Sequence, residues 1–466
     1  MEEARLFPGM GDEGEDRVRQ AKRTPNAAPR VRGPDRGQVL IQPVCLDELL
    51  PADHAARTIW RVVEQLDLSQ FYADLEARGQ DPGRPATDPR LLVALWLYAA
   101  VEGVGCGREL ARLCGCHDAY RWLCGGVAVN YHTLNDFRVG HEQALDELFT
   151  QVLAVLMDKG VVSVKCISQD GTRVRAAAGS ASFRRRTSLE KHLDAARRHV
   201  TALKLQMEES SHWSARRQAA QERAARERAE RLTAALAELE QIEAAKAQQK
   251  QKPSRERPAR ASTTDPEARV MKMGNGGFNP AHNVQLGTDT ASRAIVGVDV
   301  TKSGSDANLD QPMREQIEQR TGRKVEEYLM DGGFVTLDGV DRATVKGVVV
   351  YAPPPVPRKA GSPYAVRTGD SPAVAAWRQR MGTEAAQAKY RWRAATSETV
   401  NAELKALRGL DRFLVRGLRK VKCVAVWCAL AYNVMHFAGV LTSRTHDPAA
   451  QRALPLAAKD LRGRAG

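Results

Sequence analysis

The chain has 466 residues, of which 70 are Lys or Arg and 56 are Asp or Glu, so its net charge is +14. This length exceeds what one hydrophobic core usually fills, and the low aromatic content of 5% suits an Ala/Leu-rich, largely helical protein of two or three domains. The composition excludes wholesale disorder, a collagen-like repeat and a disulfide-stapled small protein. The basic excess favours a polyanionic partner such as nucleic acid, or an anionic membrane surface.

The N-terminal residues 1–38 are rich in Pro, Gly, Arg and acidic residues without periodicity, which predicts a disordered tail. They contain no apolar stretch typical of a signal peptide, and no segment of the chain is long and apolar enough to predict a membrane span. With eight cysteines and no export signal, we expect free thiols and a cytoplasmic location.

Short amphipathic helices are predicted between residues 39 and 158. Apolar residues recur every three or four positions, as in the run from Ile59 to Leu66. Thr87 or Asp88 can cap a helix that has Pro89 in its first turn, and further helices are expected over residues 108–113, 119–123, 133–138 and 142–158. Helices joined by glycine turns can form a DNA-reading helix-turn-helix, but an ordinary helical bundle has the same pattern.

After residue 160 the pattern changes to strands, interrupted once by a long helical segment. Val161–Ser168 is predicted to be a strand that delivers Asp170 at its end. Two apolar seams within residues 188–260 predict an inserted helical hairpin, in the simplest reading an intramolecular coiled coil. The remaining predictions are strands over 284–288, 294–300, 325–330 and 345–351, a helix over 309–319, and helices from residue 384 onward. This order is typical of a mixed α/β domain.

The positive charge is concentrated in two segments. Residues 184–260 carry a net charge of +8 and residues 384–466 carry +9, whereas the rest of the chain is slightly acidic. A localised basic surface is what binding to a phosphate backbone requires. A solvated, charged helix face is the alternative, above all for the first segment.

Two carboxylates, Asp170 and Asp331, follow predicted buried strands. Ligands of open α/β sheets gather beyond the carboxyl ends of strands, so these two side chains can meet if their strands are neighbours. Paired carboxylates are the usual protein ligands of Mg²⁺, and a third carboxylate on a helix would complete a two-metal site. An Asp-Gly pair at a strand end is also a common turn, which is the simpler interpretation of each aspartate alone.

The residues around these positions resemble the DDE transposases of bacterial insertion sequences. The segment 169–179, Gln-Asp-Gly-Thr-Arg-Val-Arg-Ala-Ala-Ala-Gly, is similar to the first-aspartate block, and 329–334, Leu-Met-Asp-Gly-Gly-Phe, to the second. The segment from Arg391 through Glu398 to Lys405 resembles the third block. Further similar stretches are 88–92, 130–132, 262–266, 282–285, 412–417 and 431–433, so that the resemblance extends in order from about residue 40 to 440.

This resemblance implies an α/β ribonuclease-H-like core, a mixed sheet flanked by helices, with an all-α N-terminal domain and an inserted helical hairpin. It implies that Asp170, Asp331 and Glu398 are catalytic and hold two Mg²⁺ ions, with Mn²⁺ as a possible substitute. Lys405 and Arg393 would contact DNA near the scissile bond, together with a basic cluster formed by Arg412, Arg416, Arg419 and Lys420. The substrate would be double-stranded DNA, both element ends and target, bound by a homodimer without a nucleotide cofactor or a membrane.

One spacing departs from that family. Relatives often have Tyr, two residues, Arg, three residues, Glu, six residues and Lys, whereas Tyr390, Arg393, Glu398 and Lys405 leave four residues between Arg and Glu. Glu403 is the competing carboxylate, but five helical residues turn it away from the face of Glu398, to which Lys405 returns.

The expected organisation is a tail (1–38), a helical DNA-binding domain (39–158), a catalytic core in two parts (159–187 and 261–440), a basic hairpin between them (188–260) and a flexible basic tail (441–466). The expected function is DNA transposition by Mg-dependent strand cleavage and strand transfer at terminal inverted repeats. The alternatives are a non-catalytic DNA-binding protein derived from a transposable element, and a helical scaffold in which the Asp-Gly pairs are incidental.

Overall fold

The computed structural model describes residues 43–73, 75, 85–209, 215–248, 258–357 and 361–443. The tail predicted at 1–38 lies outside these residues, as do the part of the 441–466 tail beyond Ser443 and the break predicted between the arms of the hairpin. No helix within the described ranges is both long and apolar enough to cross a membrane.

Seven α-helices form the N-terminal region, after a short 3₁₀ turn at Leu46–Leu49. The Asp88 side chain accepts a hydrogen bond from the backbone N–H of Arg90 and so caps the third helix, with Pro89 in its first turn. The Asn130 side chain caps the sixth helix in the same way. These helices are α1 (Ala55–Val63), α2 (Ser69–Ala73), α3 (Pro89–Val101), α4 (Gly107–Cys116), α5 (Asp118–Cys124), α6 (Tyr131–Gly140) and α7 (Glu142–Asp158).

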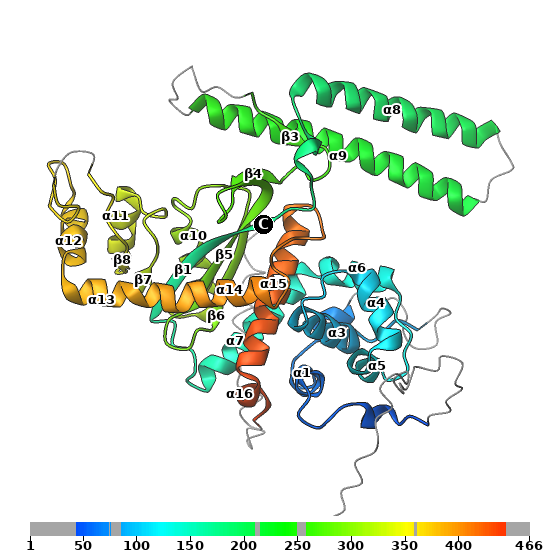
Figure 1. The fold of residues 1–466 in the computed structure, drawn as a ribbon, viewed down its shortest axis with the longest axis horizontal. Helices are drawn as coiled ribbons and strands as arrows, with labels where there is room; N and C mark the ends of the chain where they lie inside the picture. Colours follow the sequence, from blue (N-terminus) through cyan, green and yellow to red (C-terminus); the bar gives the residue numbers. More distant parts are fainter. Residues whose placement is uncertain are drawn as a thin grey trace, which may run out of the picture. The chain divides into compact units, whose positions relative to one another are not determined.

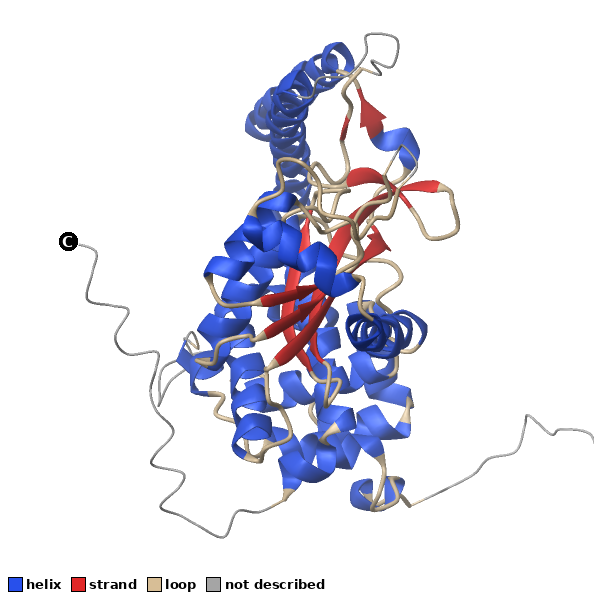
Figure 2. Ribbon diagram, turned by 90° about the vertical axis from the view of Figure 1, so that its left-hand side faces the viewer, coloured by secondary structure: helices blue, strands red, loops and turns tan. Residues whose placement is uncertain are grey.

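A mixed sheet follows, and helices cover both of its faces (Figure 2). Its strands are β1 (Cys166–Arg175), β4 (Arg269–Lys272), β5 (Phe278–Asp289), β6 (Ile295–Thr301), β7 (Glu327–Leu329) and β8 (Val349–Tyr351). Strand β5 is antiparallel to β1 on one side and to β6 and β4 on the other. Strand β7 runs parallel to β1 on its free side, and β8 runs parallel to β7.

Three of the predicted strands have other boundaries in the structure. The first begins at Cys166 instead of Val161 and does not end before Asp170, because β1 continues to Arg175 and every residue from Ile167 pairs with β5. The strand predicted over 284–288 is longer, since β5 begins at Phe278. The predicted strand over 345–351 is only Val349–Tyr351, since Val345 ends helix α11 (Leu337–Val345). Strand β4 and helices α2, α11 and α12 (Pro372–Met381) were not predicted, whereas α10 (Asp310–Thr321) ends at Gly322 in the left-handed conformation, as expected.

A long helical rod crosses the sheet region beside β1 (Figure 1). It consists of α13 (Glu384–Arg393), a π-helical turn (Ala394–Glu398) and α14 (Thr399–Ala406), without a break in the chain. The π-helical turn contacts β1 and β5. The rod therefore brings the segment around Glu398 against the strand that carries Asp170.

Helix α15 (Leu418–His436) packs against α3, α7 and β6, and the short α16 (Ala438–Thr442) follows it. The buried side chain of Asn433 donates to the carbonyl oxygen of Ile295 at 2.8 Å and accepts from its N–H at 3.0 Å. Apolar residues of the N-terminal helices, the sheet and α15 form one continuous core. Helix α15 therefore holds the N-terminal helices and the sheet region together.

The inserted helical hairpin is present, with α8 (Arg186–Glu209) and α9 (Ala215–Gln248) side by side (Figure 1). Leu189 and Leu193 pack against Leu232 and Leu239, as the apolar seams predict. The short strands β2 (Phe183–Arg184) and β3 (Ala261–Ser262) pair where the chain enters and leaves the insert. The base of α9 is fastened to the sheet region by the buried Glu238, which binds Lys302 at 2.7 Å and also pairs with Arg269 of β4.

Candidate active site

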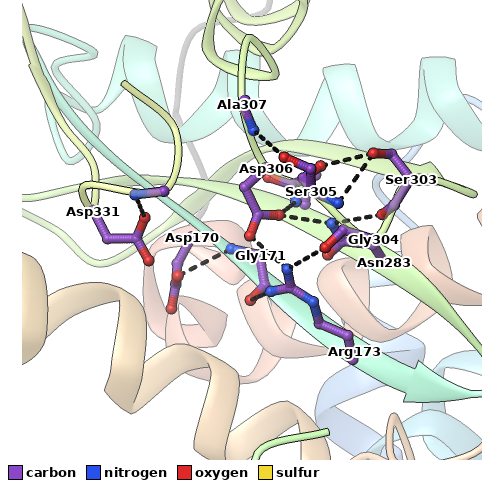
Figure 3. Close-up of polar contacts among 12 residues, drawn as sticks. Asp170, Gly171, Arg173, Asn283, Ser303, Gly304, Ser305, Asp306, Ala307 and Asp331 are labelled. Carbon is purple, nitrogen blue, oxygen red and sulfur yellow. Dashed lines mark hydrogen bonds and ion pairs between the residues drawn. The ribbon is translucent and has the colours of Figure 1, made fainter. Parts of the chain in front are cut away.

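Asp170 and Asp331 come from neighbouring parallel strands. Ser168 of β1 is paired with Leu329 of β7, and extending this register by two residues sets Asp170 opposite Asp331. Figure 3 shows the two side chains next to each other. Asp331 follows the end of β7, where its carboxylate accepts a hydrogen bond from the N–H of Gly333 at 2.7 Å. The two aspartates are thus brought together as predicted, although Asp170 lies within its strand.

Gly171 faces a polar cluster on the other side of β1, formed by Asp306, Arg173 and Asn283 (Figure 3) together with Gln285. We call it the Asp306 cluster. Asp306 accepts hydrogen bonds from Asn283 at 2.7 Å and Gln285 at 2.8 Å, and pairs with Arg173 at 2.7 Å. A β-carbon on residue 171 would lie 2.6 Å from a carboxylate oxygen of Asp306. Glycine is required here by close packing, and not by a turn.

The surroundings of Asp170 combine burial with partners for both carboxylate oxygens. Oδ1 accepts from the N–H of Gly171 at 3.0 Å and lies 3.5 Å from Nη1 of Arg393, while Oδ2 accepts from Nδ2 of Asn401 at 2.9 Å. Burial raises the pKa of Asp170, and the nearby Asp331 adds to this, so that the opposing effect of Arg393 does not restore the ordinary value. A cation beside Asp170 would favour its ionised form.

The π-helical turn accounts for the extra residue between Arg393 and Glu398. In an α-helix, residues five apart point in different directions, but a π-helical turn closes its hydrogen bonds from i to i+5 and adds one residue to the turn. Nη2 of Arg393 accordingly reaches Oε1 of Glu398 at 3.4 Å. The unusual spacing is therefore absorbed by the backbone, and Arg393 and Glu398 remain on one face.

A buried pair of serines joins the rod to the sheet. The hydroxyl oxygens of Ser168 on β1 and Ser397 in the π-helical turn lie 2.6 Å apart, and both residues are buried. Ser168 is two residues before Asp170, and Ser397 directly precedes Glu398. This hydrogen bond therefore fixes the turn that carries Glu398 beside the strand that carries Asp170.

Of the predicted basic residues, Arg393 and Lys405 lie at the carboxylates. Burial lowers the pKa of Lys405, and Asp170 is close enough to oppose this. The segment that contains Arg412 and Arg416 lies beside the C-terminal end of β1, where the N–H of Phe413 donates to the carbonyl oxygen of Arg175. That point is five residues, about 16 Å, beyond Asp170. The remaining two, Arg419 and Lys420, are exposed in the first turn of α15.

The competing carboxylate, Glu403, is directed away from this site. Its two oxygens bind Arg408 at 2.7 Å and His436 at 2.8 Å. The helical spacing therefore correctly separates Glu403 from Glu398.

The donor chemistry of the site fits a hard divalent ion, although the described residues include no group of three or more Asp, Glu, His or Cys that is already arranged to hold a metal. Asp170, Asp331 and Glu398 offer only oxygen ligands. Arg393 already places a positive charge between Asp170 and Glu398. Because the Glu398 side chain is 60% exposed, it has room to turn toward an ion that takes over this position.

Several residues of the site were not predicted from the sequence. Asn401 lies three residues after Glu398, and this helical spacing was an available signal for a shared face. Alternation along β5 was a signal for the Asp306 cluster, since Asn283 and Gln285 point to the same side of the strand. Asp306 itself lies in a loop, and no local pattern marks it.

Comparison with protein families gives two matches. A model described as "Transposase domain (DUF772)" matches residues 44–139, and a model described as "Transposase DDE domain" matches residues 359–438. The first covers α1 to α6, and the second covers α12 to α15, including Arg393, Glu398 and Lys405. No curated protein and no solved structure matches the chain. Two transposase domains in the expected places confirm the resemblance of this chain to the DDE transposases of insertion sequences.

Proposed function

We propose that this protein is a DNA transposase that binds the terminal inverted repeats of an insertion sequence and catalyses Mg-dependent strand cleavage and strand transfer. The observation that carries the proposal is the pairing of Arg393 with both Asp170 and Glu398, beside Asp331 from the neighbouring strand, with Glu398 inside the segment that matches the DDE domain. We further propose that it acts in the cytoplasm as a homodimer on element ends and target DNA.

The strand order supports a ribonuclease-H-like core. Strands β1, β5 and β6 are antiparallel neighbours, and β7 and β8 extend the sheet in parallel on the other side of β1. A mixed sheet of this order, flanked by helices, is compatible with that fold. The position of the first aspartate on the central strand, beside the end of the first parallel neighbour, is consistent with it.

Asp170, Asp331 and Glu398 would hold the divalent ions. When bound, such ions lower the pKa of an attacking water or 3′-hydroxyl and stabilise the leaving oxygen. Before DNA and ions bind, Arg393 would pair with both Asp170 and Glu398 and hold them near each other. Lys405, half-buried near Asp170, would contact a phosphate near the scissile bond, and the exposed arginines beyond the end of β1 would contact phosphates further along the duplex.

The test is strand cleavage of a labelled duplex that carries the element end, by the purified full chain with Mg²⁺ or Mn²⁺. Asp170→Ala and Glu398→Gln should abolish cleavage while binding to the same duplex survives. Glu384→Gln, which removes an exposed carboxylate from the first turn of α13 on the same rod, should cleave like the unaltered protein. Loss of binding in the two site variants, or cleavage that persists in them, would exclude these roles.

The second candidate is a non-catalytic DNA-binding protein derived from such an element. The basic segments favour it, since they need no chemistry to bind a phosphate backbone. Binding of the end duplex without cleavage under any of these conditions would select this function.

A further inference from the structure

Among the side chains of the described residues that contact Asp170 from the rod, Arg393 is charged and Asn401 is not. Asn401 lies on α14, three residues after Glu398, and is only 8% exposed. Its Nδ2 donates to Oδ2 of Asp170 at 2.9 Å. Its Oδ1 is buried and has no hydrogen-bond partner among the described residues.

The chemistry of the pair explains this unpartnered oxygen. A carboxylate only accepts hydrogen bonds, so the amide of Asn401 must turn its nitrogen toward Asp170. The amide oxygen, on the same carbon as this nitrogen, is then left without a donor in a buried setting where polar atoms are normally satisfied. Amide oxygens are ligands of hard divalent ions and acceptors for the water that such ions carry. The orphan atom therefore matches the ligand that the carboxylates would bind.

We propose that Asn401 is a positioning residue for the metal site: it fixes the Asp170 carboxylate through Nδ2 and offers Oδ1 to a hydrated divalent ion. This inference rests on the proposed function, because it assumes that Asp170 holds the ion. It adds a fourth residue to the three carboxylates and gives the buried side chain of α14 a role in ion binding. Residues that orient a metal ligand typically change the affinity for the metal by ten- to a hundredfold.

The experiment measures Mn²⁺ binding to the full chain by isothermal titration calorimetry and by the electron paramagnetic resonance signal of the bound ion. Asn401→Leu, which keeps the size and removes both polar atoms, should weaken binding at least tenfold. Asn401→Asp, which keeps an oxygen but replaces the donor with a second carboxylate, should lower the unfolding temperature without metal and show a larger stabilisation by Mn²⁺ than the unaltered protein. The two substitutions thus act in opposite directions on metal binding.

Two controls locate the effect. Asn275→Asp makes the same charge change in the exposed turn between β4 and β5, where the side chain only caps the N–H of Gly277, and should leave Mn²⁺ binding unchanged. Asp170→Ala should abolish binding. If binding depends on Asp170 but both Asn401 variants bind Mn²⁺ like the unaltered protein, the role of Asn401 is refuted while the proposed function stands. If the unaltered protein binds no Mn²⁺ through Asp170, the proposed function fails at this site and the inference fails with it.

Discussion

Replacing Gly171 with alanine would drive a β-carbon into the Asp306 cluster. The new carbon would lie 2.6 Å from Oδ1 of Asp306 and 3.0 Å from Oδ1 of Asn283, and closer still to Nε2 of Gln285, whereas ordinary contact begins near 3.4 Å. The clash cannot be relieved by one flexible chain end, because these groups are buried and bonded to one another.

The expected cost follows from these contacts. Overpacking a well-filled site costs about 1–3 kcal/mol, and one lost hydrogen bond to a charged group costs about 1.5–3 kcal/mol. We therefore expect Gly171→Ala to lower the free energy of unfolding by about 3 kcal/mol, measured from the midpoint of urea denaturation at constant slope. The matched control is Gly179→Ala, where nothing lies within 4 Å of a β-carbon and φ is −89°. This control should be neutral or stabilising by up to about 1 kcal/mol.

A double-mutant cycle tests the cause. In a Gln285→Ala background the nearest obstacle is absent, so the cost of Gly171→Ala should fall by roughly 0.5–3 kcal/mol. Strictly additive costs, or a Gly171→Ala protein that unfolds at the same urea concentration as the Gly179→Ala control, would refute the close packing of β1 against the Asp306 cluster.

Three further outcomes are expected. Deleting Ala395 should convert the π-helical turn into an α-helical one and preserve DNA cleavage. Deleting the exposed Ala402 in α14 should abolish DNA cleavage. Equal effects of the two deletions would contradict the proposal that the π-helical turn absorbs one extra residue. Ser397→Ala should cost about 1–3 kcal/mol in urea denaturation, because it leaves the buried hydroxyl of Ser168 unpaired, and the additional Ser168→Ala should recover part of this loss. Burial would raise the pKa of Glu238, but Lys302 and Arg269 outweigh this effect and hold the pKa below its ordinary value. The pairing therefore stabilises the fold fully above roughly pH 4.3, and this contribution decreases as the pH falls further. Glu238→Gln should therefore destabilise the protein at pH 7 and do so less at pH 3, and a loss that is independent of pH would disprove this electrostatic origin.

Local signals predicted most of the helices, although not α2, α11 and α12. Helix α7 spans Glu142–Asp158 as predicted, and Asp88 and Gly322 begin and end their helices for the reasons that capping gives. These features depend on a few neighbouring residues, so the sequence displays them directly.

Features that depend on distant residues were predicted less well. The polar run Gln169-Asp170-Gly171 has the composition of a turn, and only the hydrogen bonds of β5 and the Asp306 cluster make it a buried strand. The site shows the same contrast. Asp170 and Asp331 were noticed at predicted strand ends and Glu398 through the resemblance, whereas the contact of Ser397 with Ser168 of β1 has no local signal. For Asn401 the helical spacing signals only the face shared with Glu398, and its hydrogen bond to Asp170 depends on the fold. Helix length and capping are local properties, but the partners of a buried polar group are not.

The π-helical turn also bears on how such chains are identified. A sequence pattern with a fixed number of residues between arginine and glutamate assumes that the backbone always has the same helical geometry. Whether the two side chains meet depends instead on the directions in which they project from the helix axis. When one helical turn widens to a π-helical turn, it can hold an added residue and leave the relative direction of the two side chains nearly unchanged. A search that permits one extra residue between the two, above all a small one such as the alanines at 394 and 395, would recover relatives that a rigid spacing rejects.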